Sequence, residues 1–190
     1  VILDLGGWDG GDAVRFKHKY PESQVYAFEL LRRNYDIYST YMKSCDIKCF
    51  NFAITDTHGW LDFWESHHFE GQDAQSTINE PCKKYTDNYS YVKHTKSPTK
   101  VWGETISDFC YLYGINHIDV LHMDVESAEH KVIVGLGKMR PKIIFSEFLL
   151  EDAWTSQKPF NETFELLRSM GYIMVENGLP FDKLFIHDPK

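Results

Sequence analysis

The sequence lacks the features that mark membrane-spanning and disulfide-rich proteins. It has no apolar run near the roughly 20 residues that a bilayer-crossing helix needs, and no secretory signal opens the chain. Its four cysteines show neither C-x-x-C spacing nor a zinc pattern, so we expect reduced thiols in a soluble, cytoplasmic protein. An initiating methionine is also missing, and we interpret the chain as a piece of a longer protein.

Positive charge is scarce as well. Lys and Arg number 20 against 28 Asp and Glu, which gives a formal net charge of -8. This acidic balance disfavours a large nucleic-acid footprint, so no nucleic-acid partner is expected. The chain has 190 residues, enough for one domain with a real core, and we interpret residues 1–190 as a single domain.

The stretch 1–29 predicts a nucleoside-binding βαβ unit. Residues 1–5 are almost continuously apolar, as in a strand that is buried on both faces. Glycines follow at positions 6, 7, 10 and 11, in a turn where side chains would block the approach of a ligand to the backbone. A helix over 12–20 would direct its unpaired N–H groups at that turn. The next strand, 24–28, ends at Glu29, an acid well placed for the hydroxyls of a ribose.

Trp8 bears on which nucleoside is bound. The dinucleotide fingerprint G-x-G-x-x-G would need glycine at position 8, and an indole there argues against NAD or FAD. S-adenosylmethionine has a ribose and an adenine but no pyrophosphate, and the spacing Asp4-x-Gly6-x-x-x-Gly10 resembles the first motif of Rossmann-like methyltransferases. An NAD-dependent oxidoreductase and a non-catalytic nucleoside-binding domain stay open as alternatives.

Further along the chain, strand-like and helix-like segments alternate. This pattern predicts a mostly parallel, three-layer α/β domain. A turn at 56–59 indicates that strand 60–64 returns on the preceding strand as a hairpin. The predicted strands are 47–54, 60–64, 118–123, 142–146, 172–175 and 183–187. The predicted helices are 32–42, 104–113, one that carries Val132, Ile133 and Leu136 on one face and ends near 135–137, and 161–170.

Residues 65–98 are polar and show no clear period. A stretch this long without regular structure in a compact domain is usually functional or disordered, and we interpret it as a lid or an acceptor-binding loop. Its aromatic residues, together with Trp102 and Trp154, are candidates for a surface that stacks on a sugar ring. Nearer the start, Phe52 and Ala53 offer a flat apolar surface for adenine, although Phe52 is equally compatible with a purely structural role in the core.

Acidic residues gather at the predicted strand ends: Asp4, Glu29, Asp124, Glu126 and Glu147. The carboxyl ends of parallel strands meet at one edge of a sheet, so we expect these side chains to converge. Like charges in such a cluster raise carboxylate pKa values, as is common in active sites.

The chain carries a series of ordered motifs between residue 1 and about residue 150. They are Asp4-Leu5-Gly6 with Gly10, Tyr26-Ala27-Phe28-Glu29, residues 51–56 with Gly59, Thr105-Ile106-Ser107-Asp108-Phe109, Ile118-Asp119-Val120-Leu121 and Asp124-Val125-Glu126-Ser127-Ala128-Glu129. Together they resemble the motifs of the FkbM family of methyltransferases. The resemblance implies a Rossmann-like class I methyltransferase fold, with a mostly parallel seven-stranded sheet, helices on both faces and an antiparallel last strand. It also implies an S-adenosylmethionine-dependent O-methyltransferase that acts on sugar or natural-product hydroxyls.

The resemblance also assigns roles to residues. It implies that Asp4, Gly6 and Gly10 hold the methionine part of the cofactor and that Glu29 binds the ribose hydroxyls. The predicted cofactor-binding set also includes Gly7, Leu30, Phe52, Ala53 and Asp124. The resemblance places Asp124 and Glu126 near the transferred methyl group and the acceptor. The family usually has asparagine where Trp8 stands, lysine or a similar residue at His122, and glycine at Ser127, so the sequence departs from the pattern there.

Methyl transfer to an alcohol requires alignment of the reacting atoms and a base for the hydroxyl proton. Asp124 or Glu126 is the expected base, with Glu147 and His122 as second candidates; His122 also fits a neutral core histidine. Alternatively, Asp124, Glu126 and Glu147 hold a divalent cation that orients sugar hydroxyls. A small molecule or glycan is the expected acceptor, and a fused glycosyltransferase domain would suit a glycan-modifying role.

Overall fold

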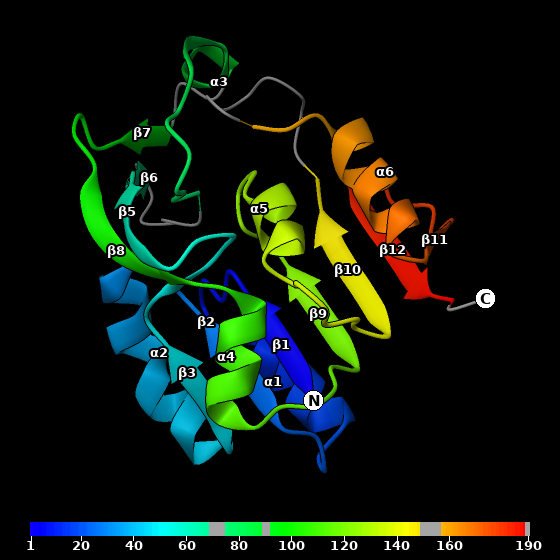
Figure 1. The fold of residues 1–190 in the computed structure, drawn as a ribbon. Helices are drawn as coiled ribbons and strands as arrows, with labels where there is room; N and C mark the ends of the chain where they lie inside the picture. Colours follow the sequence, from blue (N-terminus) through cyan, green and yellow to red (C-terminus); the bar gives the residue numbers. More distant parts are fainter. Residues whose placement is uncertain (69–74, 89–91, 149–156, 189–190) are drawn as a thin grey trace.

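The computed structural model describes residues 1–68, 75–88, 92–148 and 157–188, which fold around a seven-stranded sheet (Figure 1). The strand order is β11-β12-β10-β9-β1-β2-β3. Neighbours from β3 to β10 run parallel, whereas β12 is antiparallel to both β10 and β11. The predicted mostly parallel sheet with an antiparallel last strand is confirmed. Its strands are β1 (Ile2–Leu5), β2 (Val25–Phe28), β3 (Ile47–Phe50), β9 (Val120–Met123), β10 (Ile143–Glu147), β11 (Tyr172–Val175) and β12 (Asp182–His187).

Both faces of the sheet carry helices, as predicted. The helices α1 (Gly11–Lys19) and α2 (Arg32–Ser44) pack on one face, where Ala13, Tyr38 and Met42 join Ile2 and Val25 in one buried cluster. The opposite face carries α4 (Ile106–Tyr113), α5 (Glu129–Val134) and α6 (Phe160–Ser169), whose buried residues share a larger core with the alternate positions of the strands. This alternation explains why every residue of β1 and β2 is buried.

Phe109 of α4 lies at the centre of an aromatic cluster that joins this helix to the sheet. Its ring centroid lies 4.6 to 6.2 Å from those of five other rings, and its side chain is fully buried. The partners are Tyr26, Phe28, Phe50, Phe52 and Tyr113. The cluster packs against the ends of β2 and β3, next to a pocket that Phe28 and Phe52 line.

The prediction of one strand over 47–54 is wrong, because these residues form two strands that lie in different sheets. After β3 ends, the Asn51 side-chain amide donates to the carbonyl oxygens of Glu29 and Leu30, at 2.7 and 2.9 Å. These bonds tie the chain to the end of β2 and turn it out of the large sheet. The next strand, β4 (Ala53–Ile54), pairs instead with a later segment.

The predicted hairpin at 56–64 is also wrong. The strand β5 (Gly59–Phe63) exists, but it pairs antiparallel with β8 (Thr99–Glu104), and β8 lies between β4 and β5. Glu104 ends this strand instead of starting a helix, and the helix α4 begins after Thr105, whose hydroxyl oxygen accepts from Asp108 N. The partner for β5 therefore comes from about 40 residues further along the chain, which local pattern does not reveal.

Residues 65–98 are not without regular structure. Their described parts form the hairpin of β6 (Ser66–His68) and β7 (Val92–His94) and the short helix α3 (Lys83–Asn88). In Figure 1 these elements lie at the end of the molecule toward which β9 and β10 point. Trp154 and residues 69–74 and 89–91 lie outside the described residues, so the aromatic surface predicted there stays a prediction.

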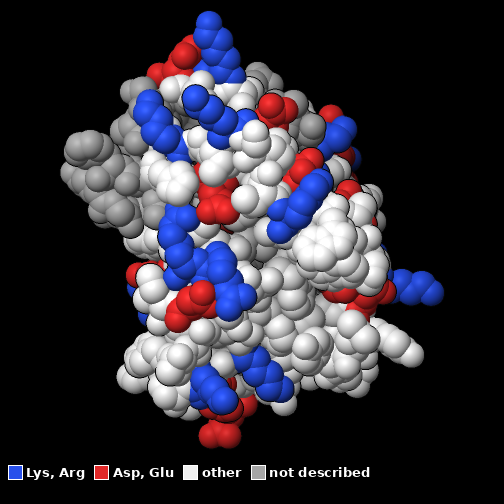
Figure 2. All heavy atoms as spheres, turned by 90° about the vertical axis from the view of Figure 1, so that its left-hand side faces the viewer, with Lys and Arg blue, Asp and Glu red and all other residues white. Residues whose placement is uncertain are grey.

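The side of the molecule with β5 and β8 carries both signs of charge. Figure 2 shows Lys and Arg side chains beside Asp and Glu side chains on this side. The ion pairs Lys100–Asp62 and Arg33–Glu65 are examples, at 2.7 and 3.1 Å. Among the described residues, no helix has the length and apolar character to cross a membrane.

We predict that Phe109→Ala destabilises the domain by about 3–5 kcal/mol, because it empties the centre of the aromatic cluster. Tyr111→Ala, on the exposed side of the same helix, is the matched control, since Tyr111 is 86% exposed. Its effect on the free energy of unfolding should stay within about 0.5 kcal/mol. Urea denaturation measures both; equal losses would contradict the described packing of α4.

Candidate functional site

The glycine turn after β1 brings two strand ends together. Gly6 has a φ of 88°, and a Cβ atom at this position would collide with the carbonyl oxygen of Asp124, at the end of β9. The backbone N–H groups of Gly6 and Gly7 both donate to the Phe28 carbonyl oxygen, at 3.1 and 2.9 Å. A side chain at Gly10 would collide with Met42 of α2. Only glycine fits this close approach, so the turn is fixed over the ends of β2 and β9.

Glu29 is tied down at the end of β2. One carboxylate oxygen accepts from Leu31 N at 2.6 Å and the other from Trp8 N at 2.7 Å. Burial raises the pKa of Glu29 to about 7, against the lowering effect of these two hydrogen bonds. Trp8 itself has a φ of 39°, a left-handed conformation that asparagine adopts more readily than tryptophan. The glycine turn and the acid thus hold each other in place.

A pocket opens over the end of β1. Because β1 lies between β2 and β9 in the sheet, Phe28, Glu29 and Leu30 flank the pocket on the β2 side, and Asp124 and Glu126 flank it on the β9 side. Trp8 also lines it, as do Ser76 and Ile78 of the segment that the sequence predicts to be a lid or an acceptor-binding loop. The predicted site residues that line the pocket are Gly6, Glu29, Leu30, Phe52, Ala53, Asp124 and Glu126.

The structure brings Asp124, Glu126 and Glu147 close enough to affect one another's ionisation. Glu147 ends β10, and its carboxyl group shares a hydrogen bond with that of Asp124. The pKa of Asp124 is raised because the surrounding chain partly removes its carboxyl group from water, although the residue reaches solvent. The pKa of Glu147 is raised to about 7 by burial and by the neighbouring charge of Asp124. Burial and the two neighbouring charges raise the pKa of Glu126 well above its usual value. These groups can accept or hold a proton near neutral pH.

Asp4 and His122 lie apart from the pocket lining. Asp4 is fully buried inside β1 and accepts or shares a proton with His122 Nδ1 at 2.6 Å, on the face of the sheet that α1 covers. Although burial lowers it, the bond to Asp4 raises the pKa of His122 overall. The His122 ring also contacts Phe16 and Phe145. This placement suits a paired core histidine; the roles of Asp4 at the cofactor and of His122 in catalysis stay predictions. Gly7 and Gly10 shape the turn without lining the pocket.

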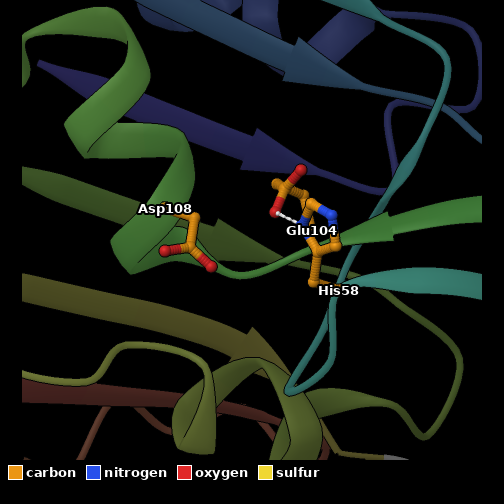
Figure 3. A group of neighbouring side chains, drawn as sticks. All are labelled: His58, Glu104 and Asp108. Carbon is orange, nitrogen blue, oxygen red and sulfur yellow. Dashed lines mark hydrogen bonds and ion pairs between the residues drawn. The ribbon is translucent and has the colours of Figure 1, made fainter.

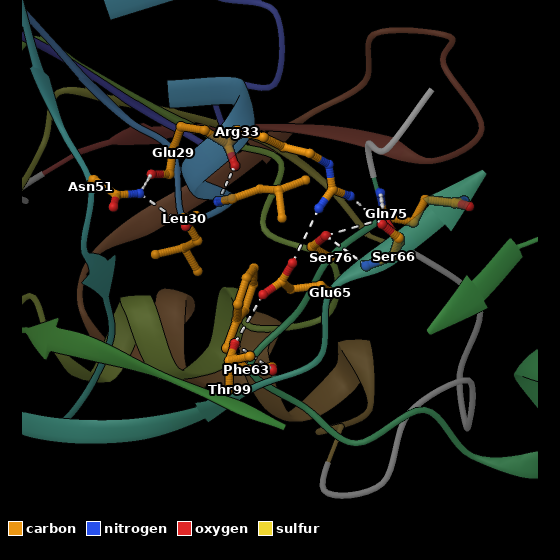
Figure 4. Close-up of polar contacts among 11 residues, drawn as sticks. Glu29, Leu30, Arg33, Asn51, Phe63, Glu65, Ser66, Gln75, Ser76 and Thr99 are labelled. Carbon is orange, nitrogen blue, oxygen red and sulfur yellow. Dashed lines mark hydrogen bonds and ion pairs between the residues drawn. The ribbon is translucent and has the colours of Figure 1, made fainter. Parts of the chain in front are cut away.

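Arg33 anchors the start of the 65–98 segment beside Glu29. Figure 4 shows its guanidinium between the Glu65 carboxylate, at 3.1 Å, and the Ser66 carbonyl oxygen, at 2.6 Å. The hydroxyl groups of Ser66, at the start of β6, and Ser76 lie 3.1 Å apart, and this contact holds the chain at Ser76 against β6. The segment is thereby brought to the pocket, where Ser76 and Ile78 form part of the lining.

One group among the described residues has the composition and spacing of a metal site: His58, Glu104 and Asp108, whose ligand atoms lie within 4.8 Å of one another (Figure 3). All three residues already make hydrogen bonds within the protein. Glu104 accepts from or shares a proton with His58 Nδ1 at 2.6 Å and accepts from Trp102 Nε1 at 3.4 Å, and Asp108 accepts from the Thr105 hydroxyl. Asp124, Glu126 and Glu147 do not form such a group, and a cation there stays a prediction.

Glu129 is a buried acid next to Glu126 that was not among the predicted site residues. It is the first residue of α5, is only 5% exposed, and accepts from Ser127 N at 3.1 Å. Burial raises its pKa to about 8. Its presence in the motif 124–129 was the available signal, but helix periodicity alone would leave a first-turn glutamate at the surface.

Comparisons with known proteins agree with this geometry. The methyltransferase FkbM domain model matches residues 6–174. The 2-O-methyltransferase NoeI of Sinorhizobium fredii is 32% identical over 176 residues, which cover 89% of this chain and 71% of the relative. A solved methyltransferase FkbM from Methylobacillus flagellatus has the same fold, with a TM-score of 0.52 at 13% identity. That match covers 98% of this chain and 43% of the solved chain, so this chain spans less than half of its length.

We predict that Glu129→Gln reduces the pH dependence of stability. Because the folded-state pKa of about 8 lies above the ordinary glutamate value of 4.5, the contribution of Glu129 to stability is fully present below about pH 4.5 and is lost as the pH rises through about 8. Glutamine keeps an acceptor for Ser127 N but does not ionise. Between about pH 5 and pH 8, the variant should lose at least ~1 kcal/mol less unfolding free energy than the parent.

Urea denaturation at both pH values measures this loss. Glu165→Gln is the control, since Glu165 is an exposed acid on α6 and should leave the pH dependence unchanged. If the free energy of unfolding changes with pH by the same amount in the parent and in Glu129→Gln, Glu129 is not buried as described.

Proposed function

The chain belongs to the methyltransferase FkbM domain family, and we propose that it transfers the methyl group of S-adenosylmethionine to a hydroxyl of a sugar or glycan. Membership makes the chain a methyltransferase that uses S-adenosylmethionine, and removes support for the NAD-dependent alternative. The observation that carries the finer proposal is the 32% identity to a 2-O-methyltransferase over most of the chain. The acidic pocket adds support, since carboxylates suit the recognition of hydroxyl groups.

The residues present fit the cofactor. Glu29 is nearly buried beside the glycine turn, and its carboxylate suits two ribose hydroxyls. Phe28 and Phe52 meet edge to face with ring centroids 5.5 Å apart and line the pocket, as an adenine ring would require. Gly6 and Asp124 both line the pocket, and in our proposal the amino-acid tail lies against them.

When bound, S-adenosylmethionine supplies a methyl group already activated by a positively charged sulfur. The protein's task is then to align the acceptor and to remove its proton. In our proposal, the Asp124–Glu147 pair takes the hydroxyl proton, because a carboxyl pair with a raised pKa can accept a proton near neutral pH. Glu126 accepts from or donates to the acceptor from its buried position.

Other expectations from the sequence stay predictions here. They include a glycosyltransferase domain fused to this chain, a cytoplasmic location, a divalent cation at the acids, and a role of residues 65–98 as lid or acceptor-binding loop. The acceptor experiment below also tests the divalent cation, since Mg²⁺ or EDTA can be added to the assay.

We predict that S-adenosylhomocysteine binds with micromolar affinity and that Glu29→Ala weakens binding at least about tenfold, because the ribose loses its acceptor. Calorimetric titration measures both. Glu22→Ala, at an exposed position just before β2, is the matched control and should bind like the parent. A preference for NAD, or unchanged binding by Glu29→Ala, would contradict the proposed pocket.

We predict that Asp124→Asn lowers the rate of methyl transfer by about 10²–10⁴-fold while S-adenosylhomocysteine still binds, because only the proton acceptor is lost. The assay screens mono- and oligosaccharides by intact mass, where one transfer adds one methyl group. Asp36→Asn, on the surface of α2, should retain activity. Cofactor binding without transfer to any hydroxyl would instead favour a non-catalytic nucleoside-binding domain.

A further inference from the structure

Two consecutive residues at the end of β9 hold an unusual backbone conformation. Glu126 and Ser127 have φ values of 51° and 75°, in the left-handed region that residues with a side chain rarely adopt. Two such residues in a row persist only when their surroundings impose the conformation. The contacts that impose it therefore determine where the Glu126 side chain points.

Most of these contacts come from residues 77–79, nearly fifty positions earlier in the chain, and the Glu129 carboxylate adds one by accepting from Ser127 N at 3.1 Å. The Thr77 hydroxyl donates to the Glu126 carbonyl oxygen at 2.8 Å. The Asn79 side-chain amide donates to both the carbonyl and the hydroxyl oxygen of Ser127, each at 3.0 Å. Thr77 and Asn79 are 1% and 3% exposed, so water does not compete for these bonds.

The two side chains are themselves held from the opposite direction. Lys131 Nζ, in α5, donates to Asn79 Oδ1 at 2.7 Å. Because lysine has no acceptor, this bond requires the amide oxygen to face Lys131 and the amide nitrogen to face Ser127. The backbone of Thr77 pairs with that of Trp64, at 2.9 and 3.1 Å. Residues 77–79 thus link the chain just after β5, in the sheet of β4, β8 and β5, to the turn that follows β9.

The supported turn directs one side chain into the pocket. Glu126 is 7% exposed and lines the pocket together with Ile78, the residue between Thr77 and Asn79. Its Oε2 atom is buried and has no hydrogen bond to any residue that the structure describes. A buried carboxyl oxygen without a partner is costly unless a ligand supplies one.

We propose that Thr77 and Asn79 are positioning residues for methyl transfer: they hold the left-handed turn at Glu126–Ser127 and so keep the Glu126 carboxyl group directed at the acceptor hydroxyl. The inference rests on the proposed function of the pocket. It differs from a purely structural role of residues 77–79, which would affect stability but not the acceptor step selectively.

The test relies on the backbone preference of glycine. Removing the amide in Asn79→Ala frees the turn, and Ser127 then leaves the left-handed region. Glycine adopts that region without penalty, so Asn79→Ala/Ser127→Gly should regain the turn without the amide. We expect Asn79→Ala to lower kcat about tenfold or more and to leave S-adenosylhomocysteine affinity within about threefold. The double variant should recover at least half of the lost activity on a logarithmic scale.

Two further comparisons keep the result unambiguous. Thr77→Val removes the hydroxyl and Thr77→Ser keeps it, so only the first should lower kcat. Tyr172→Phe is the control, because it removes a buried hydroxyl group that donates to the Pro141 carbonyl oxygen at 2.8 Å, before the start of β10 and so at the opposite end of that strand from Glu147. It should change Tm without changing kcat. Equal kcat losses in Asn79→Ala and Tyr172→Phe, or no recovery in the double variant, would overturn the proposal.

Hydrogen exchange separates this proposal from the proposed function. In Asn79→Ala, the amides of residues 124–128 should exchange faster than in the parent, and Ser127→Gly should reverse this. If the parent transfers no methyl group to any saccharide but the exchange pattern appears, the turn is held as described and the proposed function fails. If methyl transfer occurs and the exchange of these amides is unchanged by Asn79→Ala, the positioning role fails.

Discussion

The close approach of Gly6 to Asp124 is the constraint on which the site depends. The two residues follow neighbouring parallel strands, and the absence of a side chain at Gly6 lets the backbones meet. The same turn donates two N–H groups to the end of β2 and, through Trp8, one to Glu29. Three strand ends are therefore fixed relative to one another by backbone contacts. The pocket is formed by this backbone arrangement, and the side chains around it adapt its chemistry.

Burial of acids is the second property of the site. Glu29, Glu126 and Glu129 are each less than a tenth exposed, and Asp124 and Glu147 share a hydrogen bond. Removing several carboxyl groups from water favours their neutral forms and moves their pKa values toward the pH of the cell. Such an arrangement costs stability, and a protein retains it where the groups handle protons or bind polar ligands.

Two of the three departures from the family pattern carry backbone strain. Trp8 and Ser127 stand where the resemblance has asparagine and glycine, and both have a positive φ. Asparagine and glycine adopt this conformation more easily than the residues found here. The chain compensates through contacts: Trp8 N bonds to Glu29, and Ser127 bonds to Asn79 and Glu129. Stronger side-chain support thus replaces an intrinsic backbone preference.

The sequence by itself determined the strands of the large sheet, the glycine turn, the acid at the end of β2 and the family. These are local signals: apolar runs, glycine spacing and residues that directly follow a strand. The tertiary structure decided where Asp4 points, because a residue inside β1 faces whichever side the register dictates, and here it meets His122. It also decided that β5 pairs with β8 and that Asn79 reaches Ser127. Contacts between segments some 40 to 50 residues apart depend on how the intervening chain folds, and neither periodicity nor spacing encodes that path.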